Sequence, residues 1–194
     1  MIRSYNTTLG EPHRIDLLRP LILLMVIVLL DQVTKLIIVA HVPLFYHSGE
    51  IIPVLGDFLR IIHVRNLGIA FSIGHGLIPW MRRLLFIALP LVVMIVLFFF
   101  FYTSRSLTQR QRWYVAGILG GGIGNIIDRV FRPLGVVDFV DVKFFGILGM
   151  ERWPTFNVAD SAVVVCGILL VISMLFTPEP QAYTESERDT RDDQ

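Results

Sequence analysis

The sequence predicts an all-α membrane bundle of four transmembrane helices with a small extracytoplasmic β structure. Of the 194 residues, 54% are hydrophobic and only 17% are charged, and the mean hydropathy is +0.66. A soluble domain carries about 25% charged residues. Four apolar segments approach the length of about 20 residues that a helix needs to cross a bilayer. The formal net charge of +1 lacks the basic excess of a nucleic-acid-binding protein, so no nucleic-acid partner is expected.

The first two spans are predicted at residues 20–40 and 84–102. The first follows two arginines, as a signal peptide would, but no small-x-small cleavage site comes after it, so we interpret it as an uncleaved span. Asp31 and Lys35 interrupt this span. They are four residues apart with the acid first, so they share a helix face and can pair. The pair either tethers the helix near an interface or supports a functional site.

The stretch between these spans, residues 41–80, is too polar to cross a membrane. Within it, the segment 58–66 reads FLRIIHVRN and follows a turn signal at Gly56 and Asp57. Branched residues in rough alternation with polar ones predict a β-strand. We therefore expect a β hairpin or small sheet on the extracytoplasmic membrane face.

The third span is predicted at residues 113–131 and is rich in glycine. Gly121, Asn125, Asp128 and Arg129 fall within about one third of the helix circumference. Glycine on a helix face allows a neighbouring membrane helix to approach closely. We interpret Asp128 as scaffold, paired with Arg129 or with a neighbouring span. The guanidinium of Arg129 has donors for a carboxylate or a backbone carbonyl.

The fourth span is predicted at residues 157–176. It opens with Asn157 and Asp160, which share a face. A helix cap and favourable interaction with the helix dipole explain both residues in an isolated helix. However, Asp138 lies in the connection leading to this span, between large apolar neighbours. Asp138 and Asp160 are expected near one membrane face and can converge there, with Asp141 as a competing acid.

The basic residues favour one orientation. Arginines cluster before the first span and between the second and third spans, which places both chain ends in the cytoplasm by the positive-inside rule. We expect a cytoplasmic segment at 1–19, a four-helix membrane domain at 20–176 and an acidic, disordered cytoplasmic tail at 177–194.

Two carboxyl groups in a poorly solvated pocket cannot both ionise easily, so the pair shares a proton. Such a pair can hydrolyse a peptide bond, because one acid takes a proton from water while the other protonates the carbonyl oxygen. The five histidines show no HExxH spacing, and neither a metal nor a cofactor is expected. A small proton-coupled transporter and a purely structural anchor are the alternatives. No internal repeat of the kind common in transporters is evident.

Five ordered motifs, taken together, resemble the lipoprotein signal peptidase (signal peptidase II) family. The likeness extends over about 150 residues, from the first predicted span to the fourth. The motifs are Asp31-Gln32-Val33-Thr34-Lys35, Asn66-Leu67-Gly68-Ile69-Ala70-Phe71-Ser72, Gly124-Asn125-Ile126-Ile127-Asp128-Arg129, Val136-Val137-Asp138-Phe139 and Phe156-Asn157-Val158-Ala159-Asp160.

The resemblance implies an intramembrane aspartyl endopeptidase with a periplasmic β cradle at about 41–80. Family members remove signal peptides from diacylglyceryl-modified prolipoproteins, cutting before the lipid-modified cysteine. It also implies a multi-pass protein of the bacterial inner membrane, in contact with lipids and active at the periplasmic face; we expect a monomer. By motif matching, the catalytic pair is Asp138 and Asp160, of which Asp160, near a helix N-terminus, is expected to ionise first. The supporting residues are Asp31, Lys35, Asn66, Gly68, Asn125, Arg129 and Asn157.

Overall fold

The computed structural model describes residues 14–68, 78, 80–81 and 84–176. The acidic tail at 177–194, most of the amino-terminal segment and the part of the predicted cradle region at 69–77 lie outside the described residues. The predictions made for those stretches therefore remain predictions.

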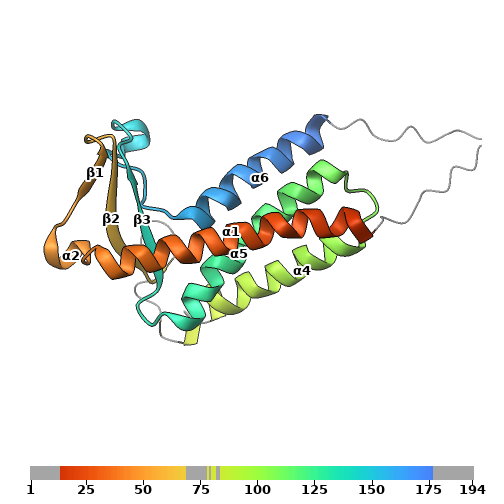
Figure 1. Cartoon of the computed structure of the whole chain (residues 1–194), viewed down its shortest axis with the longest axis horizontal. Coiled ribbons are helices and arrows are strands. Elements are labelled where there is room, and N and C mark those ends of the chain that lie inside the picture. The colour runs from red at the N-terminus through yellow and green to blue at the C-terminus, as the bar shows by residue number, and fades with distance from the viewer. Residues whose placement is uncertain (1–13, 69–77, 79, 82–83, 177–194) are drawn as a thin grey trace, which may run out of the picture.

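Four long helices form one bundle (Figure 1). They are α1 Arg14–His41, α4 Leu89–Thr103, α5 Gln109–Phe131 and α6 Val158–Phe176. A short π-helical segment, η2 Leu84–Ala88, leads directly into α4. Each of the four predicted spans thus corresponds to a helix at the expected place, although α1 begins before residue 20 and α5 begins before residue 113.

Three segments among the described residues are long and apolar enough to cross a membrane: Leu17–Ser48, Leu84–Thr103 and Val158–Phe176. Helix α5 is not among them. Its polar residues include Gln111, Asn125 and Asp128, and all three are buried inside the molecule. The prediction of membrane-spanning helices is confirmed for three segments, while the spanning role of α5 stays a prediction.

Helix α5 packs against each of the other three long helices. Glycines let α1 and α6 approach it closely. A Cβ atom on Gly121 would lie 2.3 Å from the backbone oxygen of Ala159 on α6, and one on Gly120 would lie 2.9 Å from the backbone oxygen of Leu24 on α1. The glycine-bearing face of the third predicted span is therefore a helix-packing face, as its sequence indicated.

A three-stranded antiparallel sheet covers one end of the bundle, with its strands running across the helix axes (Figure 1). The strands are β1 Ile52–Leu55, β2 Leu59–Asn66 and β3 Val136–Val142, in that spatial order. The strand predicted at 58–66 is confirmed as β2. Strand β3 was not predicted, because we interpreted this apolar stretch only as the connection that carries Asp138.

The sheet is attached to the bundle through α1 and α6. The side chains of Ile38 and Val42 on α1 pack with Val137 and Phe139 on β3. Directly before α6, the carbonyl oxygen of Phe156 accepts hydrogen bonds from the backbone amides of Phe139 and Val140, at 3.0 and 2.8 Å. The first residues of α6 are therefore held beside the middle of β3.

The register of β2 against β3 determines which side chains meet at this junction. Val64 on β2 pairs with Asp138 on β3, and Asn66 pairs with Val136. The register shifts between Ile61 and Val64, and such an irregularity redirects the side chains beyond it. Consequently the end of β2, the middle of β3 and the start of α6 lie together.

Candidate active site

A cleft of about 640 Å³ lies where the sheet meets the helices. Six of the nine residues predicted for the site line this cleft. They come from the end of β2 and the bend that follows it, from β3, from α5 and from the first turn of α6, and they are Asn66, Gly68, Asn125, Arg129, Asp138 and Asp160. The remaining three, Asp31, Lys35 and Asn157, are completely buried behind them.

Asp138 is a buried acid whose hydrogen bonds come from two amides. The Asn66 side-chain amide donates to Oδ2 at 3.0 Å, and the Asn157 amide donates to Oδ1 at 2.7 Å. Burial, followed by the nearby charge of Asp160, raises the pKa of Asp138 to about 7, against the opposing effect of the two amides and of Lys35. Asp138 can therefore hold a proton near neutral pH.

Asp160 lies in the first turn of α6 and also receives amide hydrogen bonds. The Asn125 side chain donates to Oδ1 at 2.7 Å, and the backbone amide of Asn157 donates to Oδ2 at 3.2 Å. All of these groups are donors only, so they favour a carboxylate at this position. The two acids line one cleft and share Asn157 as a hydrogen-bonding neighbour.

Asn157 caps α6, as its sequence position suggested, and its side chain also contacts Asp138. Its side-chain oxygen accepts from the backbone amide of Asp160 at 2.9 Å, which is the geometry of a helix cap. Because that oxygen is occupied by a donor, the NH₂ group faces Asp138 at 2.7 Å. The cap that starts α6 thus also orients the acid on β3.

The orientation of Asn125 follows from Lys35. The ammonium group of Lys35 can only donate, and it lies 3.0 Å from the Asn125 side-chain oxygen. Asn157 also donates to that oxygen, at 3.1 Å. The NH₂ group of Asn125 is therefore left to face Asp160. Lys35 on α1 therefore orients Asn125 so that its NH₂ group donates a hydrogen bond to Asp160 on α6.

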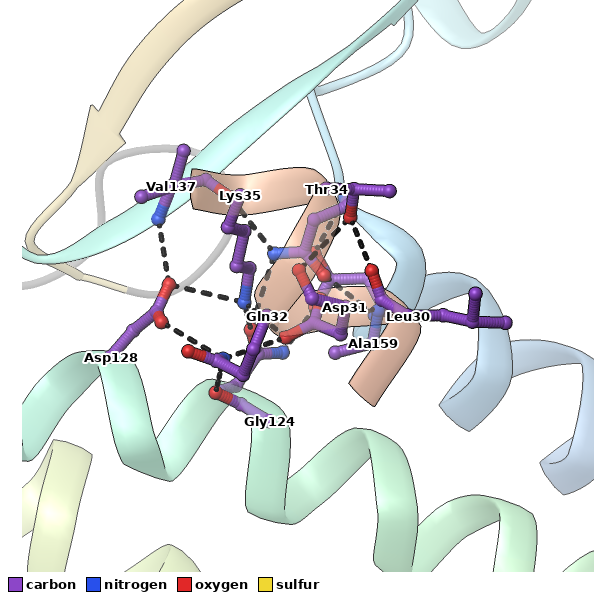
Figure 2. Close-up of polar contacts among 12 residues, drawn as sticks. Leu30, Asp31, Gln32, Thr34, Lys35, Gly124, Asp128, Val137 and Ala159 are labelled. Atoms are coloured by element: carbon purple, nitrogen blue, oxygen red, sulfur yellow. Dashed lines mark hydrogen bonds and ion pairs between the residues drawn. The ribbon is translucent and has the colours of Figure 1, made fainter. Parts of the chain in front are cut away.

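Lys35 is the centre of a buried ion cluster (Figure 2). Its Nζ atom lies 2.8 Å from Asp31 Oδ2 and 3.1 Å from Asp128 Oδ2, and all three side chains are inaccessible to solvent. Asp31 Oδ1 accepts from the backbone amide of Ala159 at 3.0 Å. The predicted pairing of Asp31 with Lys35 is confirmed, and the pair joins α1 to α5 and α6.

The prediction that Asp128 pairs with the adjacent Arg129 is wrong. Among the described residues, Asp128 forms its ion pairs with Lys35 and Arg132, and its Oδ2 atom accepts from the backbone amide of Val137 at 3.0 Å. Adjacent helix residues point in different directions, so Arg129 faces the cleft instead. The other alternative, a partnership with neighbouring segments, is correct.

Asp141, the competing acid on β3, is held by two arginines. Its Oδ2 atom lies 2.6 Å from Arg60 Nη2, and its Oδ1 atom lies 2.6 Å from Arg152 Nε. It pairs with Arg60 across the sheet. Asp141 is thus a compensated acid of the sheet, whereas Asp138 is the acid of this strand that lines the cleft.

Sequence reasoning missed several residues of the site. Gln32 donates to Asp31 Oδ2 at 3.0 Å, to the Gly124 oxygen at 3.1 Å and to Asp128 Oδ1 at 3.2 Å (Figure 2). Its place beside Asp31 in the first motif was the available signal. Trp153 lines the cleft as well, and no local pattern in the sequence pointed to it.

Comparison of the chain with known proteins identifies its family. A family model described as "Signal peptidase (SPase) II" matches residues 23–176. The chain belongs to the signal peptidase II family. The lipoprotein signal peptidase of Treponema denticola is 49% identical over 160 residues, covering 82% of this chain and 90% of that protein. The lipoprotein signal peptidase of Treponema pallidum is 51% identical over 156 residues, covering 80% and 82%.

Solved structures of bacterial membrane enzymes have a similar fold. Two structures described as bacterial membrane enzymes, determined by the in meso method, are each 29% identical to this chain. The first has a TM-score of 0.67 and covers 91% of this chain and 92% of its own. The second has a TM-score of 0.68 and covers 82% and 94%. This signal peptidase II family member is therefore a multi-pass membrane protein of the protease class, with several apolar helices and a small antiparallel sheet.

Proposed function

We propose that this protein is an intramembrane aspartyl endopeptidase that removes signal peptides from diacylglyceryl-modified prolipoproteins, cutting before the lipid-modified cysteine. The observation that carries the proposal is that Asp138 and Asp160 line one cleft, with amide donors on both and Asn157 in contact with each. The names of the relatives supply the substrate class.

The chemistry needs one ionised and one protonated acid. Asp160 takes a proton from water as the water oxygen attacks the scissile carbonyl carbon. Asp138 gives its proton to the carbonyl oxygen, and a tetrahedral diol forms. In the second half, Asp160 returns its proton to the leaving nitrogen, and Asp138 recovers a proton from the diol as the C–N bond breaks. No covalent intermediate is required.

The assignment of the proton to Asp138 rests on its surroundings. Its pKa is raised to about 7, chiefly by burial and then by the charge of Asp160. Asp160 sits in the first turn of α6, where the helix dipole favours a negative charge. Arg129 lines the same cleft and is the residue we assign to binding a substrate backbone carbonyl, because its guanidinium offers several fixed donors.

We propose that α5 is the fourth transmembrane helix. Because it packs against α1, α4 and α6, it can carry polar residues that face the interior of the bundle at membrane depth. The peptidase domain then spans 20–176 in the bacterial inner membrane. The sheet is a periplasmic cradle, both chain ends are cytoplasmic, and the protein works as a monomer among lipids.

Substrate enters the cleft sideways from the membrane in this proposal. Val164 on α6 lines the cleft and is 58% exposed, so the cleft wall continues into the outer face of this helix. An apolar signal peptide can lie against that face while the acyl chains of the substrate stay in lipid. The sheet then holds the residues beyond the cleavage point.

The test is cleavage of a diacylated prolipoprotein by the purified protein reconstituted in lipid. Asp138→Asn and Asp160→Asn are each expected to abolish the product while the folded protein still accumulates in the membrane. Glu50→Gln is the matched control, because it removes an exposed carboxylate, and it is expected to cleave like the unmodified protein. Retained cleavage by either aspartate variant would contradict the proposed mechanism, and proton flux without cleavage would favour a transporter.

A further inference from the structure

A cluster of apolar side chains is exposed at one end of the sheet. It combines the turn between β1 and β2 with the segment that follows β3, where η3 Ile147–Gly149 lies. We call this cluster the apolar tip. Its members and their exposed fractions are Leu55 61%, Phe58 46%, Phe145 64%, Ile147 54% and Leu148 82%. The rings of Phe58 and Phe145 stack with their centroids 6.1 Å apart, so the two segments form one surface.

The backbone of the tip is held in an unfavourable conformation. Phe145 and Leu148 both have a φ of 55°, which bulky residues rarely adopt. Hydrogen bonds close the turn: Phe144 N donates to the Glu151 oxygen at 2.7 Å, and Gly146 N donates to the Met150 oxygen at 3.0 Å. Strain of this kind is found where surrounding structure enforces it, often at functional surfaces. The fold therefore enforces the exposure of two large apolar side chains.

Basic and aromatic groups lie beside the tip. Lys143 Nζ is 5.7 Å from the centroid of the Phe145 ring and 2.7 Å from Asp57 Oδ2. The ring of Trp153, which is 41% exposed, meets the ring of Phe144 edge to face at 5.0 Å. Tryptophan, together with lysine and arginine reaching past apolar surface, is typical of side chains at a membrane–water boundary.

The position of the tip matches that boundary. Figure 1 shows η3 at the end of the sheet on the side of the bundle where α6 lies, and at the same end of the bundle as the start of α6. The outer face of α6 is apolar and exposed, with Ile168 at 55% and Val171 at 57%, and this helix is long and apolar enough to cross a membrane. The tip thus extends sideways toward the region that lipid around α6 would occupy.

We propose that the apolar tip inserts into the outer leaflet of the phospholipid bilayer and anchors the sheet at the membrane surface. Phe145 and Leu148 enter the apolar zone, and Lys143 contacts phosphate groups of the lipids. The segment from Arg152 to Phe156 runs from the tip to α6 and lines the cleft. The anchor therefore holds one wall of the cleft at the level of the lipid headgroups.

The test places an environment-sensitive fluorophore on single cysteines, in a Cys166→Ala background and in lipid nanodiscs. Leu148→Cys reports on the tip. Glu151→Cys, an exposed position in the same turn, is the matched control. At residue 148 we expect blue-shifted emission, quenching by doxyl groups on the lipid chains, and quenching by aqueous iodide about threefold weaker than at residue 151. Ile147→Cys provides an independent second position at the tip.

Equal quenching by iodide at residues 148 and 151 would show that the tip lies in water and would overturn the proposal. Blue-shifted emission without quenching by doxyl lipids would also overturn it, because a protein surface such as a second copy would then cover the tip. Neither readout depends on cleavage activity, so the anchor can fail while the proposed peptidase function stands.

Discussion

Two groups of acids lie on either side of Asn125. One group is stabilised by a cation and the other by neutral amide donors. Asp31 and Asp128 are fully buried and face the cation of Lys35. The hydrogen bonds described for Asp138 and Asp160 come from amides instead. The charge of Lys35 compensates the first two acids, whereas an acid with neutral donors in a buried site can exchange a proton. The first group therefore suits a scaffold and the second suits acid–base chemistry.

The largest expected effect is the loss of cleavage activity in Asp138→Asn, a change that should not reduce the stability of the fold. Asp138→Asn removes the proposed acid and should lower the rate of cleavage by about 10²–10⁴-fold or more. The same change should leave the protein at least as stable at pH 8, because burial disfavours the charged form of Asp138. The measurements are turnover of a prolipoprotein and thermal unfolding in the same detergent.

The pH dependence of unfolding sharpens this prediction. The pKa of Asp138 is about 7 in the folded protein against a reference value of 3.8. The folded protein therefore binds more protons than the unfolded chain between these values. The stability contributed by this acid is complete below about pH 4 and is lost as the pH rises through about 7. Asp138→Asn should flatten this decline, and an unchanged pH profile would contradict the assignment.

Replacing Lys35 should lower stability, whereas replacing Asp138 should not. Lys35→Met leaves Asp31 and Asp128 buried without their shared partner, and breaking a buried ion pair costs about 3–5 kcal/mol. We expect a large loss of thermal stability, with loss of activity following from misplacement of Asn125. Lys143→Met is the control, since it removes a partly exposed lysine from a surface pair. Equal stability of the two variants would show that the buried cluster is not a scaffold.

The fall of kcat/KM at high pH, the alkaline limb of the pH profile, tests whether Asp138 must be protonated. If Asp138 must be protonated, kcat/KM should fall as the pH rises through about 7. The amide of Asn66 favours the ionised form of Asp138 and so lowers its pKa. Asn66→Ala should therefore move the limb to higher pH, in addition to any drop in rate. A limb that stays in place or moves to lower pH would refute this role for Asn66.

The smallest expected effect concerns the packing around the buried cluster. A Cβ atom on Gly124 would lie 2.6 Å from Asp31 Oδ2, whereas one on Gly167 would meet no described atom within 4 Å. Gly124→Ala should lower the free energy of unfolding by about 1–3 kcal/mol through overpacking. Gly167→Ala should be neutral or stabilising by up to about 1 kcal/mol, because alanine is the better helix former. Thermal unfolding of both variants makes the comparison.

Local patterns were sufficient for the helices and for part of the site. Apolar runs located α1, α4 and α6, and the spacing of four residues predicted that Asp31 and Lys35 pair, as they do at 2.8 Å. Alternation with branched residues located β2. These features depend on residues close together in the sequence, and their periods follow from helix and strand geometry alone.

Other parts of the site depend on contacts between distant residues. The continuous apolar pattern around Asp138 did not reveal that this residue lies in a strand, because β3 is defined by pairing with β2, more than 70 residues away. The choice of Lys35 over Arg129 as a partner of Asp128 likewise follows from the packing of α1 on α5. No local rule distinguishes these partners.

Local sequence patterns were enough to predict apolar helices, an ion pair within one of them, and two amide–acid motifs near one end of the bundle. The three-dimensional arrangement was needed to show that Asp138 lines the cleft with Asp160, whereas Asp141 is paired with two arginines. This is because the partners of a side chain depend on strand register and helix packing. Both arise from the summed contacts of the whole chain.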